Sequence, residues 1–120
     1  SGDYLEFLTN EIRTALSKVT KQNLEKIIIA YEPVWAIGKS ERDAMSPNLI
    51  HEMTIFIKKT LSDLYGQEEI SKVPILYGGS VGPTNVRDIM TRGEVSGLLV
   101  GRQSLDADAF KEILGIVNSN

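Results

Sequence analysis

The sequence predicts an α/β protein built around a parallel sheet. Three short apolar segments, at residues 26–31, 73–77 and 97–100, alternate with longer segments whose apolar residues recur at three- and four-residue steps. The short segments are typical of strands buried on both faces, and the longer ones are typical of amphipathic helices. Alternation of the two kinds favours parallel strands joined by right-handed helical crossovers. We therefore expect one helix followed by three strand–helix units.

The first helix is expected over residues 4–18, and the first strand over residues 26–31. In the helix, one stripe is apolar and the opposite face is charged, as in a helix that packs on a core. The second helix is expected to begin at Ser46 and Pro47, because Ser is a favoured N-cap and Pro a favoured first helical residue. Gly66 fits the end of that helix.

The second unit is expected to contain a strand over residues 73–77 and a glycine-rich turn over residues 78–83. Thr84 or Asn85 can cap a short helix that runs to Gly93.

The third unit begins with an expected strand over residues 97–100 and continues through Gly101 into a last helix. The apolar stripe of that helix consists of Phe110, Ile113, Leu114 and Val117.

Composition limits the classes of function. The 120 residues carry a formal net charge of −3, and 42% are hydrophobic and 24% charged, which is typical of a single globular domain spanning residues 1–120. The absence of cysteine excludes disulfides and thiolate metal sites. Scattered basic residues argue against a nucleic-acid surface, and no apolar run approaches the roughly 20 residues of a membrane span. With no leader-like segment visible, we expect a cytoplasmic protein.

Chemistry is expected at the carboxyl ends of the strands, where parallel α/β folds bind their ligands. Glu32 follows the first apolar segment directly. A carboxylate at a partly dry strand end can act as a general base. The alternative is a structural ion pair with a neighbouring Lys or Arg, and position alone does not choose between them.

Glycine-rich turns follow the second and third expected strands, at Gly78-Gly79-Ser80 and Gly101-Arg102-Gln103-Ser104. Glycines allow a ligand to approach the backbone, and free N–H groups in such turns favour anions. Two turns on adjacent strands beside a carboxylate predict a phosphorylated substrate. His51, the only histidine, lies on the second helix and is expected at the surface or in packing.

The segment after Glu32 has the pattern of a hinged lid. Pro33-Val34-Trp35 is stiff, whereas Ala36-Ile37-Gly38 is small and flexible. A lid with an apolar tip can close over a site and exclude water. Trp35 alone also fits an ordinary core aromatic, and the two roles are compatible.

Three motifs resemble the triosephosphate isomerase family in order and spacing. Residues 30–38 (AYEPVWAIG) resemble its catalytic-base strand and lid, and residues 77–81 (YGGSV) resemble its seventh-strand phosphate loop. Residues 97–101 (GLLVG), followed by Ser104-Leu105, resemble its eighth strand. The resemblance extends from a helix like the family's fifth to one like its eighth.

The resemblance implies part of an eight-stranded (β/α)8 barrel and an isomerase of glycolysis and gluconeogenesis, which interconverts dihydroxyacetone phosphate and glyceraldehyde 3-phosphate. It implies that Glu32 is the catalytic base and that Tyr77 latches a lid made of Pro33, Val34, Trp35, Ala36 and Ile37. The backbone N–H groups expected to hold the phosphate belong to Gly38, Ser80, Gly101 and Arg102. No cofactor and no metal are implied.

The sequence departs from the family first in length, because a full barrel needs about 250 residues. We expect the C-terminal half of a barrel, inactive without an N-terminal half-barrel that supplies the family's catalytic lysine and electrophilic histidine. Three strands cannot close a barrel, so a homo-oligomer or a self-associating, non-catalytic half-barrel is also expected.

A second departure is Arg102, which stands where the family usually has glycine. Its side chain either adds positive charge near the phosphate or points outward. This departure leaves open a related sugar-phosphate isomerase on the same barrel.

Overall fold

The computed structural model describes residues 2–34 and 44–119. Two compact units are present, which we call the helical unit (residues 1–27 and 55–73) and the sheet unit (residues 28–54 and 74–120). The expectation of a single domain over residues 1–120 stays a prediction.

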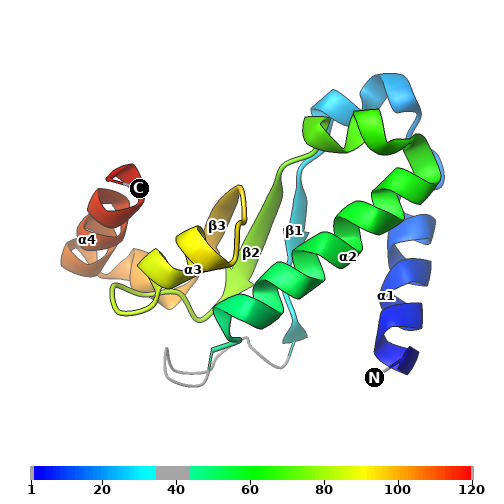
Figure 1. The fold of residues 1–120 in the computed structure, drawn as a ribbon. Helices are drawn as coiled ribbons and strands as arrows, with labels where there is room; N and C mark the ends of the chain where they lie inside the picture. The colour runs from blue at the N-terminus through cyan, green and yellow to red at the C-terminus, as the bar shows by residue number, and fades with distance from the viewer. Residues whose placement is uncertain (1, 35–43, 120) are drawn as a thin grey trace. The chain divides into compact units, whose positions relative to one another are not determined.

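In its described residues the sheet unit contains three strands, β1 (Ile29–Tyr31), β2 (Ile75–Gly79) and β3 (Gly97–Val100). They are parallel and lie in the order β1-β2-β3, with β2 in the centre (Figure 1). Tyr31 pairs with Tyr77, and Gly79 pairs with Val100. The predicted α/β class and its three parallel strands are therefore confirmed.

Helices follow each strand, as predicted. α2 (Pro47–Tyr65) lies between β1 and β2 in the chain, and α3 (Val86–Arg92) lies between β2 and β3. After β3 come a 3₁₀ turn, η5 (Arg102–Leu105), and α4 (Ala107–Asn118). α3 and α4 contact each other within the sheet unit.

The helical unit consists of α1 (Gly2–Ala15), η1 (Lys21–Lys26), the later part of α2 and η4 (Gln67–Lys72). The Tyr65 hydroxyl donates to the Val19 carbonyl at 2.8 Å and joins α2 to the segment after α1. The buried side chains of this unit are Leu8, Ile12, Leu24, Ile57, Leu61 and Val73, with Thr60.

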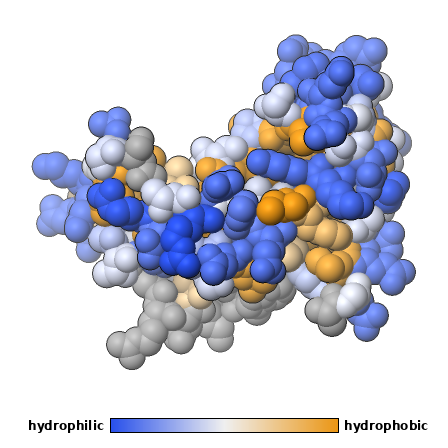
Figure 2. Space-filling model, viewed as in Figure 1, coloured by the Kyte–Doolittle hydropathy of each residue, from blue (hydrophilic) through white to orange (hydrophobic). Residues whose placement is uncertain are grey.

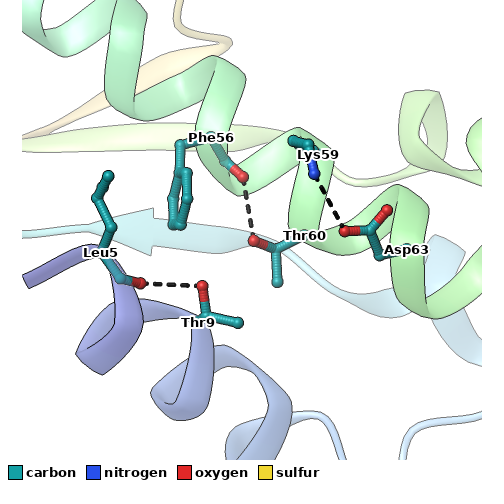
Figure 3. A network of polar contacts seen from close by, with 6 residues as sticks. All are labelled: Leu5, Thr9, Phe56, Lys59, Thr60 and Asp63. Atoms are coloured by element: carbon teal, nitrogen blue, oxygen red, sulfur yellow. Dashed lines mark hydrogen bonds and ion pairs between the residues drawn. The ribbon is translucent and has the colours of Figure 1, made fainter. Parts of the chain in front are cut away.

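Polar side chains on its helices make contacts within their own helix. Thr9 and Thr60 each donate to the carbonyl four residues earlier, and Lys59 pairs with Asp63 at 3.5 Å (Figure 3). Such contacts give the side-chain donors hydrogen-bond or ion-pair partners within the same helix.

Helix ends are fixed largely by local chemistry. The Leu49 N–H donates to Ser46 Oγ at 3.2 Å, which confirms the predicted cap of α2. Gly66 follows the last residue of α2 with a φ of +96°, a left-handed conformation that favours glycine. Asp106, which the sequence analysis did not single out, caps α4 by accepting from the N–H groups of Asp108 and Ala109.

Two of the predicted strands have wrong boundaries, and the second begins at Ile75, two residues later than predicted. The first strand begins at Ile29, because residues Lys21–Lys26 form a 3₁₀ helix instead. The second strand runs to Gly79, so Gly78 and Gly79 end the strand and do not form the turn. The reason is pairing, since Gly78 and Gly79 both have partners on β3. Tertiary pairing here overrides the local turn preference of glycine.

Burial differs between the two faces of the sheet. Tyr31, Ile75 and Tyr77 on one face are buried. On the other face Ile28 is 64% exposed and Leu99 is 39% exposed. Alternate residues of a strand point to opposite faces, and among the described residues the second face carries exposed apolar side chains. The expectation that residues 26–31 are buried on both faces is wrong, and we call this second face, defined by Ile28, Ala30 and Leu99, the open face.

The surface seen in Figure 2 is largely hydrophilic and is interrupted by smaller hydrophobic areas. Among the described residues, no helix combines the length and the apolar character that crossing a membrane requires.

Candidate functional site

The carboxyl edge of the sheet brings three predicted site residues into neighbouring positions. Tyr31 pairs with Tyr77, so Glu32 follows β1 at the level of Gly78 on β2. Gly79 pairs with Val100, so Ser80 and Gly101 follow their strands side by side. We call the residues that follow the three strands the carboxyl edge.

Glu32 rests against Gly78. A Cβ built on Gly78 would lie 2.6 Å from Cγ, 3.2 Å from Cδ and 3.5 Å from Oε2 of Glu32. Any larger residue would therefore occupy the space that the Glu32 side chain now fills. Glu32 is exposed, and Gly78 is buried. The sequence analysis assigned Gly78 to ligand approach and missed that it makes room for the carboxylate.

Tyr77 is fully buried beneath this edge. Its phenol lies so close to Gly79 that a Cβ there would overlap the hydroxyl. The hydroxyl lies near the Met45 backbone, but it does not meet the full geometry of a hydrogen bond with that group or with any other described residue. Burial raises the pKa of the Tyr77 phenol above its ordinary value, and the nearby Met45 backbone offsets part of that rise. Tyr77 thus reaches the segment that directly follows residues 35–43.

The loop after β2 is held by Asn85. Its side-chain amide donates to the Ser80 carbonyl at 2.7 Å, and its Oδ1 accepts from the Gly82 N–H at 2.9 Å. Of the two predicted candidates, Thr84 and Asn85, Asn85 occupies the N-cap of α3, but its side chain bonds backward into the loop and caps no helical N–H. The signal in the sequence is the spacing of Asn85 three residues after Gly82, which suits a side-chain-to-backbone turn.

The turn after β3 is closed by Ser104. Both its N–H, at 3.0 Å, and its hydroxyl, at 2.6 Å, donate to the Gly101 carbonyl. A Cβ on Gly101 would meet no atom within 4 Å, so the backbone at this strand end faces open space. Arg102 begins η5 and is exposed.

The predicted lid is only partly described. Pro33 is buried and Val34 is 80% exposed directly after β1. Trp35, Ala36, Ile37 and Gly38 lie outside the described residues, so their assignments to the lid and to the phosphate stay predictions.

His51 lies on α2 and does not directly follow a strand. Its Nε2 lies 3.2 Å from Oε2 of Glu94, which precedes β3 and therefore belongs to the opposite end of the strand. Both side chains are partly exposed, at 37% and 66%. His51 is a surface residue with a structural partner, in agreement with the prediction.

Together the fold and the edge define a class of protein: a parallel α/β chain with a carboxylate and two glycine-containing turns where such folds bind ligands. The family model for triosephosphate isomerase matches residues 1–117. The chain therefore belongs to the triosephosphate isomerase family.

Curated relatives agree. The chain is 40% identical over 114 residues to a triosephosphate isomerase of Flavobacterium johnsoniae, covering 95% of this chain and 45% of that protein. It is 36% identical over 119 residues to that of Lactiplantibacillus plantarum, covering 99% of this chain and 46% of that protein. It is also 40% identical over 114 residues to a triosephosphate isomerase of a Roseiflexus species, covering 95% of this chain and 44% of that protein. The chain thus spans a little under half the length of the relatives it matches.

Proposed function

We propose that this chain is the C-terminal part of a triosephosphate isomerase and supplies its catalytic base and part of its phosphate site. The observation that carries the proposal is the placement of Glu32, an exposed carboxylate seated on Gly78 at the carboxyl edge of a parallel sheet. Because the chain belongs to the triosephosphate isomerase family, we assign this carboxylate the role of base in the isomerisation of a triose phosphate.

In the proposed reaction, Glu32 removes a proton from the carbon next to the carbonyl of the bound ketose phosphate. The electrons of that C–H bond form the carbon–carbon double bond of an enediolate, the carbonyl π electrons move onto the carbonyl oxygen, and an electrophile stabilises the charge there. Return of the proton from Glu32 to the former carbonyl carbon, together with transfer of the hydroxyl proton from the first oxygen to the former carbonyl oxygen, gives the aldose. The Glu32 side chain is exposed in this structure. Closure of the site over a bound substrate is expected to remove water from around the Glu32 carboxylate.

Backbone N–H groups are proposed to hold the phosphate. Asn85 fixes the loop that carries Ser80, and Ser104 fixes the turn that carries Gly101 and Arg102. Groups fixed before a ligand arrives lose little further freedom on binding. Tyr77, buried beside Gly79 and close to the Met45 backbone, is proposed to latch the segment between β1 and α2.

An N-terminal half-barrel is proposed to complete the protein. The matched relatives are more than twice as long as this chain. The open face carries the exposed side chains of Ile28 and Leu99, which a further half-barrel could cover. That half is expected to bring the electrophile and the family's catalytic lysine. The expected homo-oligomer and cytoplasmic location are further proposals, and light scattering of the purified chain measures the first.

The test is a triose-phosphate isomerase assay on the full-length protein with Glu32→Gln. Loss of the base is expected to lower kcat by about 10²–10⁴-fold. Glu94→Gln is the matched control, since it makes the same chemical change at the opposite end of the sheet, where Glu94 contacts His51. Near-normal turnover of Glu32→Gln would sink the proposal. The 120-residue chain alone is expected to show no turnover.

A further inference from the structure

The side chain of Asn85 joins the loop after β2 to the start of α3. Its amide donates to the Ser80 carbonyl at 2.7 Å, and its Oδ1 accepts from the Gly82 N–H at 2.9 Å. We infer that Asn85 is a positioning residue for phosphate recognition, acting through the backbone of Ser80. The inference deepens the proposed function and rests on it, because that function places the phosphate of the ligand at Ser80.

The backbone of Ser80 is held on both sides. Before it, Gly79 pairs with Val100 in the sheet, which fixes the chain up to the strand end. After it, the Ser80 carbonyl accepts from the Asn85 amide. A residue has only two soft backbone dihedrals, so contacts before and after Ser80 restrict the direction in which its N–H points. Loss of the Asn85 contact frees one of the two sides.

The two contacts require an amide. Asn85 donates through Nδ2 and accepts through Oδ1 at the same time, whereas an ionised Asp can only accept. A Ser offers one short hydroxyl in place of the two arms of an amide. As helix N-caps, by contrast, Asn, Asp and Ser are about equally good. The residue type at this position therefore matches the loop contacts more closely than it matches a capping role.

Asn85 makes these contacts instead of capping its helix. It occupies the N-cap of α3, a helix of 7 residues, yet its side chain makes no cap hydrogen bond. A cap without its side-chain hydrogen bond lowers helix stability. The loop itself is packed on the core, since Val81 is 2% exposed and Gly82 is buried. The side chain thus stabilises one conformation of the loop at the expense of the helix, as expected where the loop recognises the ligand.

The experiment compares two substrates on the full-length protein, glyceraldehyde 3-phosphate and glyceraldehyde, the same aldose without its phosphate. Asn85→Ser is expected to lower kcat/KM about tenfold for the phosphorylated substrate and much less for glyceraldehyde, because only the first substrate uses the loop. The inhibition constant of inorganic phosphate should rise by a similar factor. Asn85→Asp is expected to be at least as impaired, since it loses the donor and adds negative charge near the phosphate.

Asn23→Ser is the matched control. It makes the same change in the helical unit, where the Asn23 amide donates to Thr20 Oγ1 at 3.2 Å. The ratio of the two kcat/KM values is expected to stay as in wild type. Backbone amide spectra of the ¹⁵N-labelled 120-residue chain show that each variant is folded.

The outcomes separate the two claims. Equal losses on both substrates in Asn85→Ser, or no loss on either, would mean that Asn85 does not act on phosphate recognition, and the inference is wrong. A similar change of the ratio in Asn23→Ser overturns it as well. The proposed function itself is contradicted if wild type does not convert glyceraldehyde 3-phosphate, or if Glu32→Gln, which is expected to slow both substrates, slows neither.

Discussion

The two ends of the sheet differ in how their polar groups are satisfied. At the amino edge, which we define as the residues that lead into the strands, Ser96 accepts from the Ile75 N–H at 3.2 Å and donates its own N–H to the Ile75 carbonyl at 2.8 Å. There, too, His51 contacts Glu94. At the carboxyl edge, Glu32 is exposed, and the Tyr77 hydroxyl has no hydrogen-bond partner in the described part of the chain.

The difference separates groups that hold the fold from groups that remain available. A buried polar group without a partner lowers stability, so its retention points to a use beyond folding. The amino edge carries contacts that stabilise the sheet. The carboxyl edge carries groups that, under the proposed function, find their partners in a ligand or in the segment over the site.

A pair of glycine substitutions, one at each edge of the sheet, tests this difference most strongly. Gly78→Ala places a methyl group against Glu32, which is exposed and can move aside. Displacing the base is expected to lower kcat/KM of the full-length protein about 10²-fold with little change in unfolding midpoint. Gly93→Ala, near the amino edge, places its methyl group 2.5 Å from the Ile89 carbonyl oxygen and 3.1 Å from Ile50.

Because a backbone oxygen cannot move aside easily, Gly93→Ala is expected to lower the free energy of unfolding by about 1–3 kcal/mol. The folded fraction should keep its activity. Urea unfolding and steady-state kinetics on both variants measure the two effects. The comparison fails if Gly78→Ala is the less stable variant, or if Gly93→Ala is the less active one per folded molecule.

A second pair of variants removes one hydroxyl from each edge. Ser96→Ala leaves the Ile75 N–H without its side-chain acceptor and is expected to lower stability by about 1 kcal/mol. Tyr77→Phe removes a buried hydroxyl that has no hydrogen-bond partner among residues 2–34 and 44–119, and, to the extent that no partner is supplied from outside them, it is expected to raise stability by about 1 kcal/mol. Urea unfolding at neutral pH measures the change in the free energy of unfolding for each variant. A large loss of stability in Tyr77→Phe would contradict the account of this residue.

Alkaline pH tests Tyr77 independently. Its pKa is raised in the folded chain above the ordinary 10.0. The unfolded chain therefore releases this proton first, and the contribution of Tyr77 to stability is lost as pH rises above 10. Tyr77→Phe should show a shallower alkaline decline than wild type, and equal declines would mean that the phenol is not responsible.

The smallest expected effect concerns His51 and Glu94. The pair is partly exposed, so a double-mutant cycle with His51→Ala and Glu94→Ala is expected to give a coupling energy below about 1 kcal/mol. Neither substitution should change phosphate binding by the chain. A change in the amide signals of Ser80 or Gly101 in these variants would show that the two edges are coupled.

Local sequence chemistry determined a large part of the structure. The α/β class, the three parallel strands, the Ser46 cap and the Gly66 stop all follow from periodicity and from residues close in the chain. Glu32 could be placed at a strand end for the same reason. The identity of that carboxylate as a base came from motif resemblance and stays a proposal.

Only the tertiary structure decided which residues lie against one another. Gly78 seats Glu32, which is 46 positions earlier, and pairing with β3 extends β2 through two glycines that local preference assigns to a turn. The three-strand pattern led us to expect an uncovered face, but only the structure shows that it carries Ile28 and Leu99, since an apolar strand looks alike whether one or both of its faces are covered. The spacing of residues along the chain indicates the type of each element and where it ends. Which residues contact one another, and which faces of the sheet stay uncovered, depends on segments that only folding brings together.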